Sequence, residues 1–440
     1  MRLSMFKNRV FPIIIVIVLV LISCGNKTKE HTIAKDITEW QNEVLENSPY
    51  LAQIPDADLT KIVVGANLTD SYTSLLKGKS VGIVANQTSV IFNKSYFNSY
   101  LREYTIKTKP YTHLVDSLLK RDIKIKKVFA PEHGFRGKAD AGEVVKDGID
   151  TKTGIPIVSL YGKNKKPSAE QLANLDLVVF DIQDVGARFY TYISSLHYVM
   201  EACAEANIPM LILDRPNPNG HYIDGPILEP EHKSFVGMHP IPIVHGMTIG
   251  EYAKMINGEG WLKNGITCDI TVIGMQNYNH NKTYGLPIKP SPNLPNDTSI
   301  NLYPSLCFFE GTNVNAGRGT SKQFQIYGSP YLDKTVYNFK YIPSPNEGAK
   351  YPKHDGVLCY GEDLSAHEKM NTLDLNYLIR AYKNSIDKSV FFNDFFIKLA
   401  GTKELQLQIE SGMSQKEIKD TWIKGLNTFK KTRAKYLVYD

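Results

Sequence analysis

Two carboxylates, an amide and a guanidinium lie close together in one short stretch of the chain. The stretch is residues 181–192, and it follows an apolar run at 175–180 that is typical of a fully buried strand. Its candidate functional residues are Gln183, Asp184, Arg188 and Tyr190. Ligands bind beyond the carboxyl ends of the strands in an open α/β sheet, so we predict a site here. In the alternative interpretation, Asp181 caps the next helix and pairs with Arg188.

The same pattern recurs where other apolar runs end. Polar side chains follow the runs at 81–85, 125–130 and 209–213. These further candidates are Asn86, Gln87, Glu132, His133, Arg136, Asp214, Arg215 and Asn217. Right-handed crossover connections bring the carboxyl ends of parallel strands to one edge of a sheet. Residues that are far apart in the sequence are therefore expected to share one crevice.

The elements that must position these residues alternate between strand and helix. Apolar runs, the last of them at 269–274, are separated by segments with helical periodicity. This alternation predicts an α/β fold with a Rossmann-like, doubly wound parallel sheet. Thr248 and Glu251 have the spacing of a capping box, so we favour helix capping over catalysis for Glu251.

A proline-rich connection at 286–295 interrupts both periodicities, and we place a domain boundary there. The predicted organisation is a Rossmann-like catalytic domain at 59–287 and a smaller α+β C-terminal domain at 288–440 that closes the active-site cleft. Candidate residues in the second domain are Glu310, Asn313 and Arg318. Helices are expected near 372–384, 389–400 and 414–424.

The composition is that of an ordinary globular protein. The chain has 440 residues, enough for two or three domains. Its 51 basic and 45 acidic residues give a formal charge of +6 with no basic stripe, so nucleic acid is not an expected partner. Four of the five cysteines have the wide spacing of buried thiols and not that of a zinc motif or a dense disulfide scaffold. They are Cys203, Cys268, Cys307 and Cys359.

The first residues predict export and lipidation. A basic start, an apolar run at 11–22 and then Ser23 and Cys24 resemble a bacterial lipoprotein signal peptide at 1–24, with Cys24 as the lipidated first residue of the mature protein. The run is short for a transmembrane helix, although an uncleaved anchor is the alternative. Residues 25–58 are polar and are expected to act as a tether. The predicted location is the bacterial cell envelope, on the periplasmic or cell-surface side.

Neither a nucleotide cofactor nor a metal is expected. No strand is followed by the Gly-x-Gly-x-x-Gly turn of dinucleotide-binding folds, and a P-loop is absent from the sequence. Residues 78–82 match the Gly-x-Ser-x-Gly motif, but they precede a strand, whereas a nucleophile elbow follows one. The histidines do not have zincin spacing.

Carboxylates, amides, arginines and tyrosines remain, and they suit the hydrolysis of a glycosidic bond. That reaction needs a carboxylic acid to protonate the leaving oxygen and a second group to stabilise or attack the anomeric carbon. Glu132 beside His133, with Asp184 on a neighbouring loop, could supply the pair. An arginine could hold a substrate carboxylate through two parallel hydrogen bonds.

Five motifs, in order, resemble the NamZ-type exo-β-N-acetylmuramidases over about residues 75–440. The motifs are residues 131–137, 181–192, 214–218, 245–248 and 309–313. The resemblance implies release of N-acetylmuramic acid from the non-reducing ends of peptidoglycan fragments. It also implies an active site between a Rossmann-like domain and a smaller C-terminal domain, and it adds His245 to the candidate residues.

We predict that Glu132 is the general acid and base, because it lies just past a strand end beside His133. The substrate's 2-acetamido group is a possible nucleophile, and Asp184 would then orient it. Direct attack by a second carboxylate and attack by water with inversion are the alternatives. The lactyl ether of muramic acid carries a carboxylate, so the resemblance implies that one of the candidate arginines binds it. Our order of preference is Arg188, followed by Arg136 and Arg318.

The expected partners are muramyl saccharides or muropeptides, together with a membrane through the lipid anchor. Two other functions stay open. A non-catalytic lipoprotein could use the same cleft to bind cell-wall sugars. A cell-wall esterase or amidase would need a serine or cysteine nucleophile, which the motifs do not contain.

Overall fold

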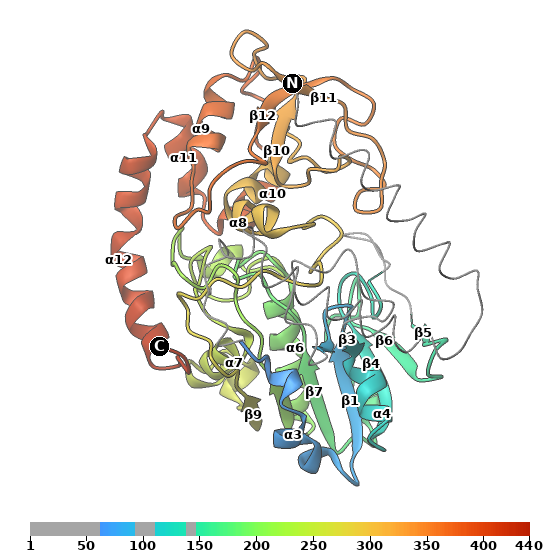
Figure 1. Ribbon diagram of the computed structural model, residues 1–440. Helices are drawn as coiled ribbons and strands as arrows, with labels where there is room; N and C mark the ends of the chain where they lie inside the picture. The colour runs from blue at the N-terminus through green and yellow to red at the C-terminus, as the bar shows by residue number, and fades with distance from the viewer. Residues whose placement is uncertain (1–61, 93–110, 138–146) are drawn as a thin grey trace, which may run out of the picture. The chain divides into compact units, whose positions relative to one another are not determined.

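The computed structural model describes residues 62–92, 111–137 and 147–440 (Figure 1). The predicted signal peptide with Cys24 and the predicted tether at 25–58 lie outside the described residues. Within the described residues, no helix has both the length and the apolar character needed to cross a membrane.

Seven strands of the described chain form the central sheet, in the order β5-β6-β4-β1-β7-β8-β9. They are β1 (Ser80–Ala85), β4 (Lys124–Ala130), β5 (Gly148–Ile149), β6 (Pro156–Ser159), β7 (Leu177–Asp181), β8 (Met210–Leu213) and β9 (Ile270–Ile273). All neighbours are parallel except the edge strand β5, which is antiparallel to β6. Counted along the chain, the parallel strands have the Rossmann order 3-2-1-4-5-6, which confirms the predicted fold class. The order reverses between β1 and β7.

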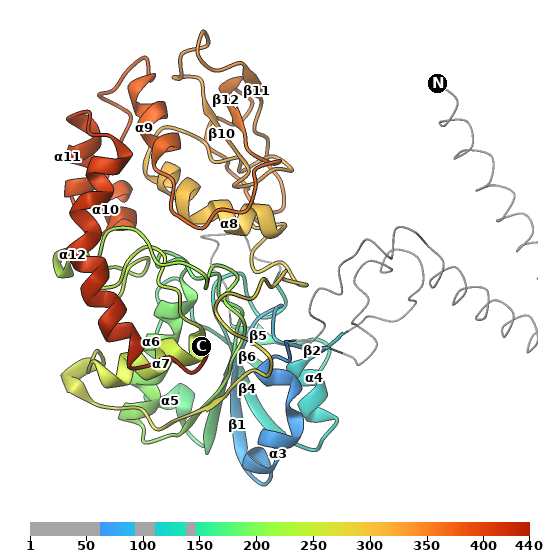
Figure 2. The same cartoon turned by 60° about the vertical axis from the view of Figure 1, so that its left-hand side comes forward.

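Strand β7 explains why the central runs are apolar throughout. Leu177 and Val179 pack into the core on one face of the sheet, and Val178 and Phe180 pack into the core on the other. Successive side chains of a strand point to opposite faces, so a sheet that is covered on both faces needs apolar residues at every position. The covering helices lie on both sides of the sheet in Figure 2. They are α3 (Thr69–Leu76) and α4 (Leu114–Leu119) on one face, and α5 (Ala169–Leu172), α6 (Tyr192–Glu205) and α7 (Ile249–Gly258) on the other.

Short elements complete this part of the chain. A two-stranded antiparallel ladder joins β2 (Val90–Phe92) to β3 (Tyr111–His113). Single 3₁₀ turns lie at Gly65–Asn67, Pro230–His232 and Lys263–Gly265. Thr248 and Glu251 form the capping box of α7, so the predicted capping role of Glu251 is confirmed.

The C-terminal part combines helices with a small antiparallel sheet of order β10-β12-β11. Its elements are α8 (Asp297–Leu306), the 3₁₀ helix η6 (Cys307–Gly311), β10 (Ile326–Ser329), β11 (Phe339–Tyr341), β12 (Cys359–Asp363), α9 (Asn376–Lys383), α10 (Phe395–Ala400), α11 (Glu404–Glu410) and α12 (Gln415–Ala434). Helix α12 is longer than predicted, because Phe429 continues the buried stripe of Ile418 and Trp422.

Lys61–Asp440 forms one compact unit. Cys203, Cys268, Cys307 and Cys359 are all free and buried, as predicted. The domain boundary predicted at residue 288 falls in the connection between β9 and α8.

Candidate active site

Glu132 lies in the turn that follows strand β4. The turn closes with a hydrogen bond from the Gly134 amide to the Pro131 carbonyl at 3.0 Å. His133 has φ 68° and Gly134 has φ 75°, so two consecutive residues adopt the left-handed region. A non-glycine residue adopts it at a cost, and such strain concentrates at functional sites. The turn leaves Glu132 partly exposed and buries His133.

Two hydroxyl groups hold the carboxylate of Glu132. Tyr161, just past β6, donates to Oε1 at 3.0 Å. Thr191, which precedes α6, donates to Oε2 at 2.7 Å and makes no capping hydrogen bond of its own. Loops that follow three parallel strands, β4, β6 and β7, therefore fix one carboxylate. Each of its two oxygens therefore accepts a hydrogen bond from a hydroxyl group.

Glu132 lines a cavity of about 310 Å³ between the sheet edge and the C-terminal part. This volume is within the range of small-molecule sites, roughly 300–1,000 Å³. The sheet side contributes Glu132, His133, Tyr161, Phe189, Tyr190 and Thr191. The C-terminal side contributes Tyr303, Cys307, Glu310, Arg318, Phe324, Phe395 and Leu399. Phe235, Val236, Ser291, Asn293 and Leu294 complete the lining.

One wall of the cavity is aromatic. Tyr303 packs edge-to-face against Phe189, Tyr190 and Phe324, with ring centroids 4.9 to 6.0 Å apart. The Tyr190 hydroxyl donates to the Pro290 carbonyl at 2.7 Å, which ties the proline-rich connection to the end of β7. Burial raises the pKa of Tyr303 well above its usual value, so its phenol stays neutral. Such a wall offers an apolar surface against which a sugar ring can pack.

Glu310 and Arg318 form an ion pair on the C-terminal side of the cavity. Arg318 Nη1 lies 3.0 Å from Glu310 Oε2, and about a quarter of each side chain is exposed. Arg318 Nη2 donates to the Gly348 carbonyl at 3.3 Å. Burial opposes the charge of Arg318, but Glu310 outweighs it, so the pKa of Arg318 is raised. Of the three arginines considered from the sequence, Arg318 alone is among the cavity-lining residues of the described structure.

Arg188, the arginine ranked first from the sequence, is completely buried in backbone contacts. Its guanidinium donates to the carbonyls of Pro226, Ile241, Leu399 and Ala400 at 2.6 to 3.0 Å. A Cβ on Gly401 would lie 2.6 Å from Arg188 Nη2, so the neighbouring chain must be glycine. Burial lowers the pKa of Arg188 to about 9. Arg188 joins the sheet edge to α10, and our order of preference is revised in favour of Arg318.

Arg136 also binds other groups of the protein, the carboxylates of two aspartates. It makes a two-point contact with Asp150 at 3.0 and 2.6 Å and a further contact with Asp116 at 3.3 Å. Asp150 is buried, and although burial opposes its charge, the hydrogen bonds from Arg136 and Thr153 prevail and lower the pKa of Asp150 to about 2. This arginine fixes the loop after β4 from outside the cavity.

Asp184 is buried behind the cavity wall and is not one of the lining residues. Its Oδ2 accepts from the Gly186 amide at 2.7 Å and lies 3.8 Å from His245 Nε2. Burial raises the pKa of Asp184 to about 7, against the opposing effect of the Gly186 and Val185 amides. Burial lowers the pKa of His245 to about 3, so this imidazole is neutral at pH 7.

Asp214 and Arg215 anchor the chain beyond β8. The Asp214 carboxylate accepts from the Gly250 amide, the Thr248 hydroxyl and the Tyr439 hydroxyl at 2.7 to 2.9 Å. Burial raises its pKa to about 6. Arg215 makes a buried two-point ion pair with Asp181, at 2.6 and 2.9 Å. The alternative interpretation of Asp181 is therefore wrong: it does not cap α6, and its partner is Arg215 and not Arg188.

The candidate amides serve mainly to hold loops. Asn86 accepts from Thr88, Gln87 and Gln183 donate to backbone carbonyls, and Asn217 donates to the Met247 carbonyl at 2.9 Å. Asn313 lies one residue past Thr312, with both polar side-chain atoms buried and unpartnered within the described structure. None of these amides lines the cavity in the described structure.

Sequence reasoning missed Tyr161, Thr191, Asn293 and Tyr303. Tyr161 follows the apolar run of β6, so the strand-end pattern that found Glu132 could have found it. Thr191 lies in the stretch considered first, but nothing in its type separates it from a capping residue. Asn293 and Tyr303 lie in a proline-rich connection and in the unpredicted helix α8, where the sequence carries no comparable signal.

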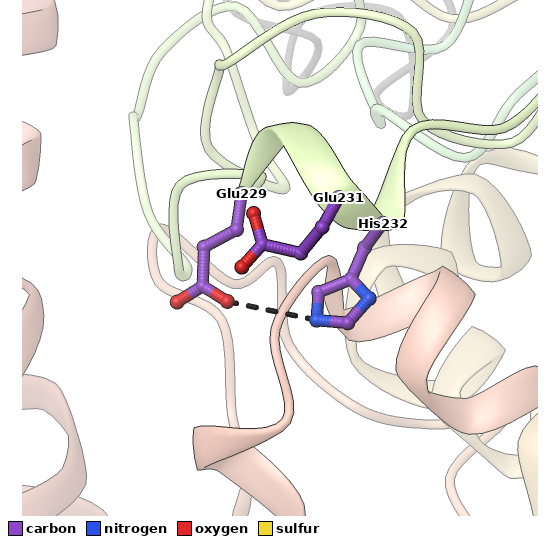
Figure 3. Close-up of side chains that lie close together, drawn as sticks. All are labelled: Glu229, Glu231 and His232. Atoms are coloured by element: carbon purple, nitrogen blue, oxygen red, sulfur yellow. Dashed lines mark ion pairs between the residues drawn. The ribbon is translucent and has the colours of Figure 1, made fainter.

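Potential metal ligands gather elsewhere, at Glu229, Glu231 and His232 (Figure 3). Glu229 Oε2 lies 3.6 Å from His232 Nε2, and Glu229 Oε1 accepts from the Thr402 hydroxyl at 2.8 Å. These contacts explain the cluster as a tie between its loop and the end of α10. None of the three residues lines the cavity.

Comparisons with known proteins agree on one family. A family model described as "Exo-beta-N-acetylmuramidase NamZ, N-terminal" matches residues 81–298, and the corresponding C-terminal model matches residues 301–439. A peptidoglycan β-N-acetylmuramidase NamZ from Bacillus subtilis (strain 168) is 41% identical over 394 residues, which are 84% of this chain and 90% of that protein. The resemblance drawn from the sequence motifs is thereby confirmed.

Two solved structures from Bacteroides fragilis share the fold. Both are DUF1343 family proteins. The first is 45% identical with a TM-score of 0.77, and the match covers 87% of this chain and 99% of that one. The second is 26% identical with a TM-score of 0.69, and the match covers 86% of this chain and 99% of that one.

Proposed function

The chain belongs to the NamZ family of exo-β-N-acetylmuramidases, and on that premise we propose that it releases N-acetylmuramic acid from the non-reducing ends of peptidoglycan fragments. The observation that carries the proposal is the cavity, whose lining includes both a carboxyl group held by two hydroxyls and an arginine. Its volume suits one terminal sugar residue.

Glu132 is the proposed general acid and base. Its protonated form gives a proton to the leaving glycosidic oxygen, and its carboxylate later takes a proton from the attacking water. Tyr161 and Thr191 hold the carboxyl group so that both transfers use one geometry. His133 is the next residue of the strained turn and is buried, and its proposed role is to hold the turn that carries Glu132.

The second group of the reaction is the substrate's own 2-acetamido oxygen or a second carboxylate. Among the described residues, Glu310 is the other carboxylate that lines the cavity, and it is already paired with Arg318. Asp184 does not line it. A paired carboxylate is a weak nucleophile, so we favour the acetamido oxygen.

Arg318 is the residue that we propose binds the lactyl carboxylate of the substrate. It lines the cavity, and its Nε has no hydrogen-bond partner in the described structure. A guanidinium can hold a carboxylate through two parallel hydrogen bonds. Glu310 keeps Arg318 in place while leaving it donors to spare.

We also propose that the enzyme is a lipoprotein of the cell envelope, anchored through Cys24. The support is the sequence of residues 1–24. Cys24→Ala should release the protein from membranes or block its processing, as fractionation and the mass of the mature protein would reveal. Unchanged partitioning together with unchanged mass would reject the anchor.

A chromogenic β-N-acetylmuraminide tests the activity directly. We expect release of the chromophore, and much slower release from the matching β-N-acetylglucosaminide, which lacks the lactyl group. Binding of the muraminide without turnover would indicate a sugar-binding protein instead. Turnover of ester or amide substrates alone would indicate the other alternative. The cavity's Cys307 is poorly suited to that role, because burial raises its pKa and keeps the thiol protonated.

A further inference from the structure

Asn293 lines the cavity and has one polar atom without a partner. The side chain is 3% exposed. Its Nδ2 donates to the Gly348 carbonyl at 2.6 Å, whereas Oδ1 has no hydrogen-bond partner in the described structure. A carbonyl can only accept, so the contact with Gly348 identifies the unpartnered atom as the oxygen. A buried acceptor that lacks a donor is unfavourable and requires an explanation.

Asn293 and Arg318 share the carbonyl of Gly348. Arg318 Nη2 donates to that oxygen at 3.3 Å, so the carbonyl joins the two side chains into one wall. A Cβ on Gly348 would lie 2.6 Å from Asn293 Oδ1, and the absence of a side chain there permits the close approach. Arg318 and Asn293 both line the cavity, and a donor atom of the first, Nε, and an acceptor atom of the second, Oδ1, are buried without hydrogen-bond partners in the described structure.

We propose that Asn293 Oδ1 accepts the N–H of the substrate's 2-acetamido group and orients that group for attack on the anomeric carbon. This inference rests on the proposed function. In N-acetylmuramic acid the acetamido group at C2 is next to the lactyl ether at C3. The Arg318 guanidinium suits the lactyl carboxylate, and the adjacent Asn293 oxygen suits the acetamido N–H. The two protein groups therefore match two neighbouring groups of the sugar. Asn293 thereby takes the orienting role that the sequence suggested for Asp184.

The step balances as follows in atoms and charge. The acetamido oxygen forms a bond to C1 while the bond from C1 to the leaving oxygen breaks, and Glu132 gives its proton to that oxygen. The resulting oxazolinium ion carries positive charge over the N–H that Asn293 accepts, so this hydrogen bond strengthens as the charge develops. Water then adds to C1, its proton passes to Glu132, and the bond from C1 to the acetamido oxygen breaks.

Three variants test the proposal with the chromogenic β-N-acetylmuraminide. Asn293→Leu removes the acceptor at similar volume, and Asn293→Asp keeps an acceptor. Asn346→Ala is the matched control, because Asn346 holds the same turn by accepting from the Gly348 amide at 3.2 Å. For Asn293→Leu we expect kcat to fall about 10- to 100-fold with little change in KM, as for a hydrogen bond that is strongest with the charged species. Asn293→Asp should recover part of kcat, because it keeps an acceptor but loses the donor to the Gly348 carbonyl, and Asn346→Ala should stay near the wild type.

A second measurement does not depend on turnover. The thiazoline derived from N-acetylmuramic acid mimics the cyclic intermediate, and calorimetry should show that Asn293→Leu weakens its binding while Asn346→Ala does not. If Asn293→Leu fails to fold, Asn293→Ser supplies the comparison, since its shorter side chain withdraws the acceptor.

Three results would overturn the role of Asn293. They are normal kcat and thiazoline affinity in Asn293→Leu, equal losses in the Leu and Asp variants, and the same loss in Asn346→Ala. Failure of the proposed function is a separate result, because the wild type would then leave the muraminide intact.

Discussion

The two halves of the sheet edge use their polar residues differently. Past β4 and β6, Glu132 and Tyr161 line the cavity and bond to each other. At the ends of β7 and β8, Asp181 and Arg215 pair in the interior, and Asp214 holds the start of α7 and the end of the chain; only further along the loop after β7 does Thr191 reach Glu132. The position is the same in both halves, at the carboxyl end of a parallel strand. What differs is the surroundings: Glu132 lines a cavity of about 310 Å³, whereas Asp181 and Arg215 are buried and satisfy each other's charge.

The largest expected effect is the loss of catalytic activity when Glu132, which lines the cavity, is replaced. Glu132→Gln removes the transferable proton at almost constant shape, so kcat on the muraminide should fall by about 10²- to 10⁴-fold. Folding and sugar binding should persist, which thermal melting and calorimetry would check. Near-normal turnover would shift the general-acid role to Glu310, the cavity's other carboxylate in the described structure.

Substitutions in the buried Asp181–Arg215 ion pair should lower the stability of the protein. Arg215→Met leaves Asp181 as a buried carboxylate without its cation, which typically costs about 3–5 kcal/mol of unfolding free energy. Denaturant titration would measure this loss, and the double variant Asp181→Leu/Arg215→Met should regain part of it. If Arg215→Met unfolds at the denaturant concentration of the wild type, the contrast between the two halves does not hold.

Specificity should depend on the cavity wall of the C-terminal part. Arg318→Met removes a charge-assisted contact with the lactyl carboxylate, worth about 2–5 kcal/mol in a partly buried site. The ratio of kcat/KM for muraminide over glucosaminide should therefore collapse. Arg380→Met is the control, because Arg380 also pairs with a glutamate, Glu362, but lies outside the cavity. An unchanged ratio in Arg318→Met would mean that other groups read the carboxylate.

The sequence predicted the sheet well because its signal is local. A strand covered on both faces must be apolar at every position, and β1, β7 and β8 each show such a run. Glu132 was found by the same local rule. The function of Arg188 could not be read this way, since two of its four carbonyl partners, Leu399 and Ala400, lie more than 200 residues further along the chain.

Asn293 marks the other limit of prediction from sequence. An asparagine in a proline-rich connection is expected in any turn. Its significance comes from the Gly348 carbonyl, 55 residues away, which fixes its amide and leaves Oδ1 without a donor. The helix α12 was predicted too short for a related reason: its last turns are stabilised by burial of Phe429 against the rest of the fold.

Asp184 could be a neutral structural acid or an ionised group that acts in catalysis. The pH dependence of the protein's stability should show which of these it is. Its folded pKa of about 7 is above the ordinary value of 3.8, so the native state favours the protonated acid. Its contribution to stability is therefore complete below about pH 4 and is lost as pH rises toward 7.

Asp184→Asn keeps an acceptor for the Gly186 amide but cannot ionise. The variant should gain stability relative to the wild type by up to about 1.4 kcal/mol per pH unit across this window. Denaturant titrations of both proteins at pH 5, 6, 7 and 8 would measure the slope, and His245 stays neutral over this range because burial lowers its pKa to about 3. A flat difference would mean that Asp184 is ionised throughout. The cavity would then have a buried negative charge behind it, available to stabilise the oxazolinium ion, and Asp184 would belong with the catalytic half.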